Sequence, residues 1–138
     1  MKRRVLIVMV LLASCSNELH GSLSVEAAGK QWSVIPDECY SGERKGFYGV
    51  DLLSQQDKSS AIRAILSPTE GPSIRVLEPG TDKDLIFDKT SKCAVLDLEV
   101  DRQNSTINNI HNVSGRLNID CEGPGFKLKS DITFANCH

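Results

Sequence analysis

The C-terminal third of the chain alternates apolar and polar residues with a period of two, and this pattern limits the fold more than any other feature. Ala94–Val100, Val113–Cys121 and Phe126–Phe134 each gather apolar residues on one face. A period of two is typical of a half-buried β-strand, whereas a helix repeats about every 3.6 residues. Turn residues recur throughout the chain, as in small β-domains. We therefore expect an all-β fold, either an antiparallel β-sandwich or a barrel.

The three alternating segments predict an antiparallel three-stranded meander from residue 93 to 136. Glu122–Gly125 is expected to be a turn, and Arg102–Asn112 a longer polar loop. The facing pairs of this register are Cys121 with Phe126, Ile119 with Leu128, Leu117 with Ser130, Gly115 with Ile132, Val113 with Phe134, Val100 with Val113, and Leu96 with Leu117. Each apolar face then meets another apolar face, and a slip of one residue would reverse this.

The earlier part of the chain contains shorter strand candidates. These are Ser22–Val25, Gln31–Ile35, Phe47–Leu53, Ile74–Leu77 and Leu85–Phe87. Ala28 and Gly29 join the first two as a hairpin, and Cys39–Gly46 is expected to be a charged loop. Ala61–Leu66 is apolar apart from Arg63, and its period does not distinguish a strand from a helical turn over so few residues.

The first fifteen residues have the three parts of an export signal. Residues 2–4 are basic, Val5–Leu12 is an uninterrupted apolar run, and small residues follow it. The run is shorter than the roughly 20 apolar residues that a spanning helix needs. Leu12-Ala13-Ser14-Cys15 resembles the lipobox of bacterial lipoproteins, which implies cleavage before Cys15 and lipidation of Cys15. An ordinary secretory signal with an incidental cysteine is the alternative.

This resemblance implies a domain organisation and a location. Residues 1–14 would be the signal peptide, residues 15–21 the lipidated N-terminus with a short polar tether, and residues 22–138 a single β domain. The membrane is then a partner through the lipid on Cys15. Ser16 stands where the enteric inner-membrane retention signal has Asp, so the outer membrane is the expected destination, facing the periplasm or the outside. Gly115-x-Leu117-x-Ile119-Asp120-Cys121 and the final Cys137-His138 also resemble small exported lipoproteins of unassigned function.

If Cys15 carries lipid, four of the five cysteines remain, and an even set in an exported domain predicts two disulfides. Their spacing contains no Cys-x-x-Cys pair, which argues against zinc. A straight final strand separates Cys121 from Cys137 by far more than the roughly 4.4–6.8 Å between Cα atoms that a disulfide allows. We therefore expect Cys93–Cys121 and Cys39–Cys137. Because alternation places Cys93 on the outer face, a bulge at residues 92–94 is needed.

Charge and motifs exclude several functions. The chain has 16 basic and 18 acidic residues; residues 1–14 hold three basic and no acidic ones, so the remaining 124 residues carry 13 against 18, a net charge of −5. Such a domain lacks the basic patch that nucleic acid requires. Asp97, Glu99 and Asp101 are expected to be the wet face of a sheet, and His111 and His138 exposed residues rather than metal ligands.

No catalytic constellation can be assembled from the sequence. It has no Gly-x-Ser-x-Gly motif and no Gly-rich phosphate loop, and nothing implies a cofactor. Trp32, Tyr40, Phe47 and Tyr48 lie within seventeen residues, as a candidate binding cluster for an envelope protein or a glycan, or as core residues. We expect a non-catalytic binding or structural module of the cell envelope. The alternative is a hydrolase that acts on an envelope polymer.

Overall fold

The computed structural model describes residues 16–55 and 61–138, which form ten β-strands and one 3-10 turn. The elements are β1 (Glu18–Ala27), β2 (Lys30–Val34), β3 (Glu38–Ser41), the 3-10 turn η1 (Gly42–Lys45), β4 (Gly49–Leu53), β5 (Ala61–Ser67), β6 (Gly71–Leu77), β7 (Asp84–Phe87), β8 (Cys93–Ile107), β9 (Ile110–Gly123) and β10 (Phe126–Cys137). The signal region, the lipobox and Cys15 lie outside the described residues. None of the described residues forms a helix long and apolar enough to cross a membrane.

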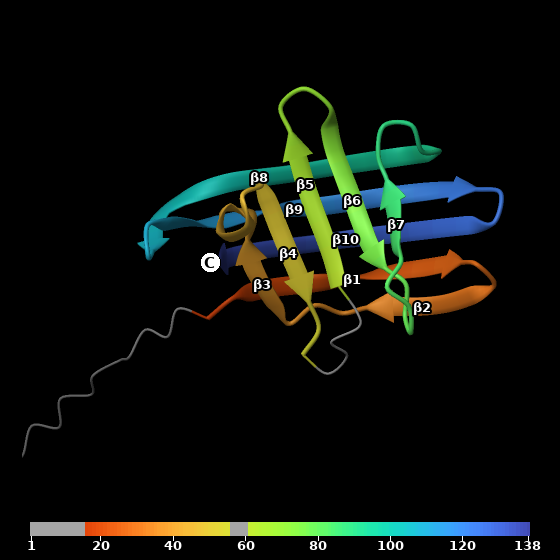
Figure 1. Ribbon diagram of the computed structural model, residues 1–138, viewed down its shortest axis with the longest axis horizontal. Helices are drawn as coiled ribbons and strands as arrows, with labels where there is room; N and C mark the ends of the chain where they lie inside the picture. Colours follow the sequence, from red (N-terminus) through yellow and green to blue (C-terminus); the bar gives the residue numbers. More distant parts are fainter. Residues whose placement is uncertain (1–15, 56–60) are drawn as a thin grey trace, which may run out of the picture.

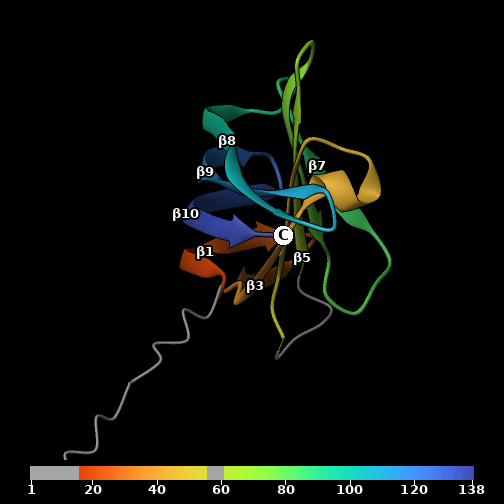
Figure 2. The same cartoon turned by 90° about the vertical axis from the view of Figure 1, so that its left-hand side faces the viewer.

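The strands form two five-stranded antiparallel sheets, so the expected all-β fold is confirmed as a sandwich. Sheet A has the order β2-β1-β10-β9-β8 and sheet B the order β3-β4-β5-β6-β7. The strands of the two sheets cross at a steep angle (Figure 1), and the sheets lie as two layers when viewed from the end (Figure 2). Their inner faces enclose one apolar core, to which residues such as Leu23, Leu52 and Leu117 contribute fully buried side chains.

The C-terminal meander β8–β9–β10 is confirmed, but its predicted register is wrong by two residues. Leu128 pairs with Cys121, and Ile132 pairs with Leu117. The chain turns at Pro124 and Gly125 alone, because the residues before them continue β9. A shift of two keeps every side chain on its predicted face, so the hydrophobic pattern did not distinguish the two registers.

The predicted loop Arg102–Asn112 is also wrong, because β8 and β9 extend through it as a long hairpin. Its turn is Asn108-Asn109, whose φ angles are 51° and 64°. Asparagine tolerates this left-handed conformation, and two such residues match the turn that suits the twist of a hairpin. The pairs on β8 are accordingly Val100 with Gly115 and Leu98 with Leu117.

Both predicted disulfides are present. Cys39–Cys137 joins β3 of sheet B to β10 of sheet A, and Cys93–Cys121 joins β8 to β9 within sheet A. The pairing shifts between Cys93 and Val95, where two residues of β8 advance against one of β9. This is the bulge that the alternation of the sequence required, and it brings Cys93 opposite Cys121.

The N-terminal half contains further differences from expectation. Strand β1 begins at Glu18, because Glu18–Gly21 pair with the end of β10, so these residues belong to the sheet rather than to a tether. The predicted loop Cys39–Gly46 contains β3 and η1. The hairpin around Ala28 and Gly29 is confirmed, and Ala61–Ser67 is a strand.

Candidate functional site

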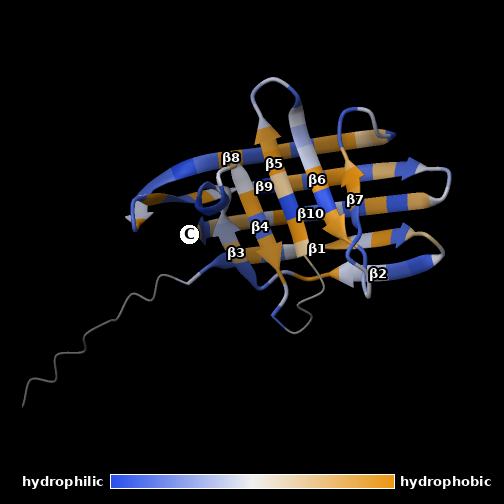
Figure 3. Cartoon of the chain, in the orientation of Figure 1, coloured by the Kyte–Doolittle hydropathy of each residue, from blue (hydrophilic) through white to orange (hydrophobic). Residues whose placement is uncertain are grey.

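The outer faces of the two sheets differ in chemical character. On sheet A the outward rows are Gln31–Glu26–Lys127–Glu122, Ser33–Ser24–Lys129–Asp120–Val95, Ser22–Asp131–Asn118–Asp97 and His20–Thr133–Arg116–Glu99. All of these side chains except Val95 are polar, which is the ordinary wet face of an antiparallel sheet. Hydropathy along the strands shows the same alternation in sheet A and longer apolar stretches on β4, β5 and β7 of sheet B (Figure 3).

Sheet B instead presents apolar and charged side chains together on its outer face, which we call the sheet-B face. It consists of Glu38, Tyr40, Asp51, Leu53, Ala61, Arg63, Ile65, Ser73, Arg75, Leu77, Asp84 and Ile86. Ile86 has 54% of its surface exposed, although it is a large apolar residue in a strand. A sheet face that combines apolar side chains with charged ones indicates a contact surface rather than general solvation.

One cross-strand row of the sheet-B face runs through all five strands. It reads Tyr40, Asp51, Arg63, Arg75 and Ile86, from β3 to β7. Tyrosine and arginine are the residue types enriched in the energetically important centres of protein interfaces. The row therefore combines an aromatic residue, two guanidinium groups and an exposed aliphatic residue on one surface.

Asp51 is the most buried charge of this row, with 6% of its surface exposed. Arg63 donates from Nε and Nη2 to the two carboxylate oxygens at 2.7 and 3.0 Å, and Lys45 Nζ lies 2.9 Å from Oδ2. Burial alone raises the pKa of Asp51, but the hydrogen bonds from Arg63 and Lys45 outweigh it, so this pKa lies below its ordinary value. Asp51 therefore remains a carboxylate and holds Arg63 in a fixed orientation.

Arg75, next to Arg63 in the row, is exposed, and no carboxylate lies within 4.0 Å of it in residues 16–55 and 61–138. A hollow of about 280 Å³ lies between these two arginines, with Leu53, Ala61 and Leu77 among its other walls. Its size falls just below the roughly 300–1,000 Å³ of small-molecule sites. The hollow thus fits one or two side chains of a partner better than a whole cofactor.

The four aromatic residues that the sequence groups together do not form one cluster. Trp32 packs against the core from β2. The aromatic ring pairs of the described residues are Tyr40–His138 and Phe87–Phe126, and neither joins two of the four. Of the four, Tyr40 alone belongs to the sheet-B face.

Three of these aromatic rings are each covered by an arginine, a feature that the sequence did not reveal. Tyr40 is covered by Arg44 at 5.0 Å, Phe47 by Arg63 at 4.8 Å and Tyr48 by Arg102 at 5.6 Å, measured from guanidinium carbon to ring centroid. The Tyr48 hydroxyl also donates to the Val100 carbonyl oxygen, which ties sheet B to sheet A. The Phe47 ring thereby supports the arginine that lines the hollow.

Glu43 and His111 form the one carboxylate–imidazole contact within 4.0 Å that the described residues contain. His111 Nδ1 lies 3.5 Å from Glu43 Oε2, to which the His111 backbone N–H also donates. Burial raises the pKa of Glu43, but the backbone of His111 and the charge of Arg102 lower it more, so its net shift is downward. These contacts attach η1 to β9, and a structural role accounts for them.

The other polar predictions have simple outcomes. Asp97, Glu99 and Asp101 are exposed on β8, as expected for a wet face. His111 and His138 are half-buried rather than exposed as predicted. His111 pairs with Thr106 and contacts Glu43, and His138 packs on Tyr40. Within the described parts of the chain, no group of three or more His, Cys, Asp and Glu side chains is arranged to hold a metal ion.

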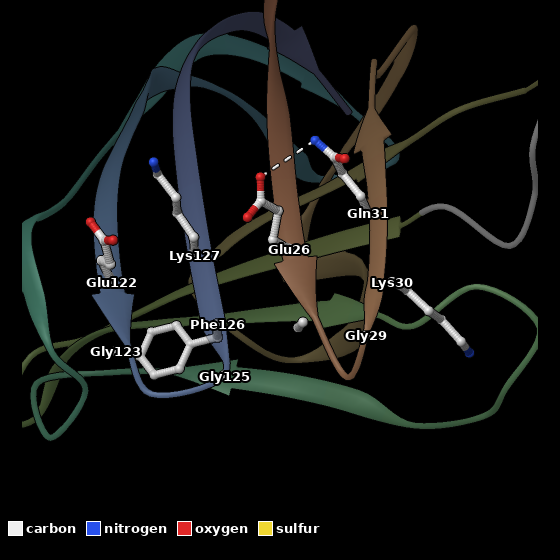
Figure 4. Close-up of a pocket in the computed structure, with 10 residues that line it drawn as sticks. Glu26, Gly29, Lys30, Gln31, Glu122, Gly123, Gly125, Phe126 and Lys127 are labelled. Atoms are coloured by element: carbon white, nitrogen blue, oxygen red, sulfur yellow. Dashed lines mark hydrogen bonds between the residues drawn. The ribbon is translucent and has the colours of Figure 1, made fainter.

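A second depression lies at the end of sheet A that carries the β1–β2 and β9–β10 turns (Figure 4). Glu26, Lys127 and Glu122 stand side by side in one cross-strand row there, and Gln31 donates to Glu26. Charges of opposite sign alternate along this row, so it selects no ligand of definite charge. The sheet-B face is the better candidate.

Comparison of the chain with protein-family models, curated proteins and solved structures gives no match. The assignment of a site therefore depends on the geometry alone. One sequence signal did point to it, since Arg63 is the single charged residue in an otherwise apolar segment. Its partner Asp51 is on a different strand, and only the pairing of β4 with β5 brings the two together.

Proposed function

We propose that this protein is an exported lipoprotein, anchored by Cys15, that binds an envelope protein through the sheet-B face without catalysis. The lipobox resemblance supports the anchor. Ser16 after Cys15 favours the outer membrane, with the domain in the periplasm or at the cell surface. One chain alone holds a protein to a bilayer weakly, whereas the several chains of a bacterial lipoprotein give lasting attachment.

The observation that carries the binding role is the contrast between the two outer faces. The outward rows of sheet A are polar apart from Val95, whereas the sheet-B face offers Tyr40, Leu53, Leu77 and Ile86 beside two arginines. Burial of apolar surface would supply affinity, at about 25 cal/mol per Å² before the costs of association.

The partner that fits this face is a protein with an acidic side chain. Asp51 already neutralises Arg63, whereas Arg75 has no carboxylate partner among residues 16–55 and 61–138. Two nitrogens of Arg75 can therefore donate to a carboxylate of the partner. The leucines and Ile86 around it suit aliphatic side chains of the same partner. A partner protein can supply both kinds of group over the whole width of the sheet.

This proposal is tested by photocrosslinking in cells. A photoreactive amino acid in place of Ile86 is expected to give an adduct of discrete mass with one envelope protein. Arg75→Glu in the same chain should abolish most of that adduct by reversing the charge that the partner meets. Lys129→Glu is the matched control, because it makes the same charge change at an exposed mid-strand position on sheet A.

Two results would contradict the binding face. One is an adduct that is equally strong with the photoreactive residue at position 129 of sheet A. The other is an adduct at position 86 that Arg75→Glu leaves unchanged while Lys129→Glu weakens it. Either would move the contact away from the sheet-B face.

A further inference from the structure

The tip of the β8–β9 hairpin carries two isoleucines within an uncharged stretch of sequence. Ile107 has 41% of its surface exposed and pairs across the turn with Ile110. From Gln103 to Ile110 the sequence contains no charged residue, although 25% of the whole chain is charged. The turns at the opposite end of sheet A differ, since Lys30 and Lys127 lie beside them. An uncharged tip with two isoleucines is unusual on this molecule.

This tip lies at the same end of the sandwich as the start of β1. Leu19 pairs with Phe134, and Phe134 pairs with Gly115, so the three residues lie in one row across sheet A. Beyond this row β1 leads toward the N-terminus, and β9 leads back to the hairpin tip. Figures 1 and 2 show the start of β1 and the hairpin tip at one end of the molecule.

The hairpin tip and Cys15 can lie at similar distances from this row. Four residues from Leu19 to Cys15 span at most about 14 Å when fully extended. Five residues from Gly115 to Ile110 span about 16 Å as a strand. Figure 2 shows that the hairpin curls across the end of the sandwich. A bilayer that holds Cys15 would therefore meet the hairpin tip.

Two arginines near the hairpin, Arg102 and Arg44, already have partners within the protein, so apolar contact rather than attraction to anionic lipid would dominate. Arg102 Nε lies 2.6 Å from Glu43 Oε1. Arg44 donates to the His138 carbonyl oxygen and covers the Tyr40 ring. Neither arginine is free to bind an anionic headgroup without giving up a contact within the protein.

We propose that Ile107 and Ile110 insert into the interfacial layer of the same phospholipid bilayer that holds the lipid of Cys15. This rests on the proposed anchoring. The hairpin would act as a second contact that fixes the orientation of the domain, with sheet A strands directed away from the membrane. The sheet-B face would then not lie against the membrane, and a partner protein could reach it from the side of the domain.

The test uses the lipidated full chain in vesicles of phosphatidylcholine and phosphatidylglycerol whose acyl chains are brominated near the headgroup end. Bromine quenches tryptophan emission only at short range. Ile107→Trp adds a reporter at the tip, Ile110→Trp adds a second one, and Ile86→Trp is the control near the opposite end, beside the β9–β10 turn. The wild type gives the background from Trp32, its single tryptophan.

We expect most of the added emission of Ile107→Trp and Ile110→Trp to be lost, and that of Ile86→Trp to persist. The same result is expected in phosphatidylcholine alone, because the contact is apolar. Added emission that survives at both tip positions, in protein that floats with the vesicles, would overturn the hairpin contact but leave the anchor standing. Wild-type protein that does not float with the vesicles would contradict the anchor itself, and the hairpin proposal with it.

Discussion

At the scale of single residues, Asp51 shows how a carboxylate can be buried on the outer face of a sheet. Lys45 and Arg63 satisfy it, and they leave 59% and 36% of their own side-chain surfaces exposed. The two cations keep contact with water while the anion loses it, so the cost of desolvation falls mainly on one group. The arrangement positions Arg63 beside the hollow of the sheet-B face.

Asp51→Asn is expected to lower the free energy of unfolding at neutral pH by about 1–3 kcal/mol, because it removes the charge that both cations bind. The pKa of folded Asp51 lies below its ordinary value of 3.8. The stabilisation is therefore complete above about pH 4 and is lost as the pH falls through the folded pKa. Urea denaturation of the wild type and of Asp51→Asn should give a difference in the free energy of unfolding that is smaller at pH 3 than at pH 7.

The matched control for this change is Asp131→Asn. Asp131 also binds an arginine, Arg116, at 2.7 Å, but both side chains are at least half exposed. An exposed pair contributes little, so no clear change in stability is expected. An equal loss from the two substitutions would show that burial is not what makes the Asp51 contacts important.

Gly115 is a second residue whose identity has a physical reason. A Cβ atom there would lie 1.8 Å from the Glu99 carbonyl oxygen and 2.8 Å from the Phe134 ring. Phe134 is the cross-strand neighbour of Gly115 and fills the space that a side chain would occupy. The glycine in the alternating pattern of β9 thus belongs to the buried face, as its position in the sequence indicated.

At the scale of elements, the two disulfides have different tasks. Cys93–Cys121 closes 28 residues between neighbouring strands of one sheet, and Cys39–Cys137 closes 98 residues between the two sheets. In the chain-entropy account, a closed loop of about 100 residues contributes about 4.7 kcal/mol, and a loop of about 28 residues about 3.6 kcal/mol. The bridge between sheets should therefore stabilise the domain more.

This difference can be measured with two double variants. Cys39→Ala with Cys137→Ala should lose about 1 kcal/mol more stability than Cys93→Ala with Cys121→Ala, in urea under non-reducing conditions. Peptide mapping of each variant should show the other disulfide intact, which excludes exchange between the bridges. A larger loss of stability from the Cys93/Cys121 variant would contradict this ranking. It would mean that the bulge at Cys93 needs its disulfide more than the packing of the two sheets needs Cys39–Cys137.

At the scale of the whole molecule, the proposed anchor and the two candidate surfaces have separate places. The β8–β9 tip and the start of β1 are at one end, and the sheet-B face runs along one side of the sandwich (Figures 1 and 2). A domain held at its end can present its side to a partner. The polar outer face of sheet A would then remain the solvated side.

Cys15→Ala is expected to abolish lipidation, because the proposed lipobox makes the thiol of Cys15 the group that receives the lipid. The wild-type protein should partition into the detergent phase on phase separation, and the variant should either stay as precursor or partition into the aqueous phase. Ser14→Ala is the control, since it keeps a small residue before the cysteine and should still partition with detergent. An unchanged partition of Cys15→Ala would contradict the lipoprotein assignment.

Much of the fold could be predicted from the sequence because the signals are local. Side-chain alternation along a strand does not depend on distant residues, so it identified the meander and its buried faces. The limited span of a disulfide, set against the length of β10, identified both bridges. Register within the meander was predicted two residues away from its true value, because an even shift preserves each face and only the turn at Pro124 and Gly125 decides between them.

The candidate site depended on the tertiary structure. The sequence did not place Asp51, Arg63 and Arg75 on one face, because it showed neither which strands are neighbours nor which face of a strand meets the other sheet. The order of the strands and the packing of sheet A on one side of sheet B decide these points, and both depend on contacts between residues far apart in the chain. The same packing placed Trp32 against the core and Tyr40 on the outer face, although both belong to one aromatic-rich segment. Local chemistry determined the strands and bridges, and the contact between the two sheets decided which side chains remain available for binding.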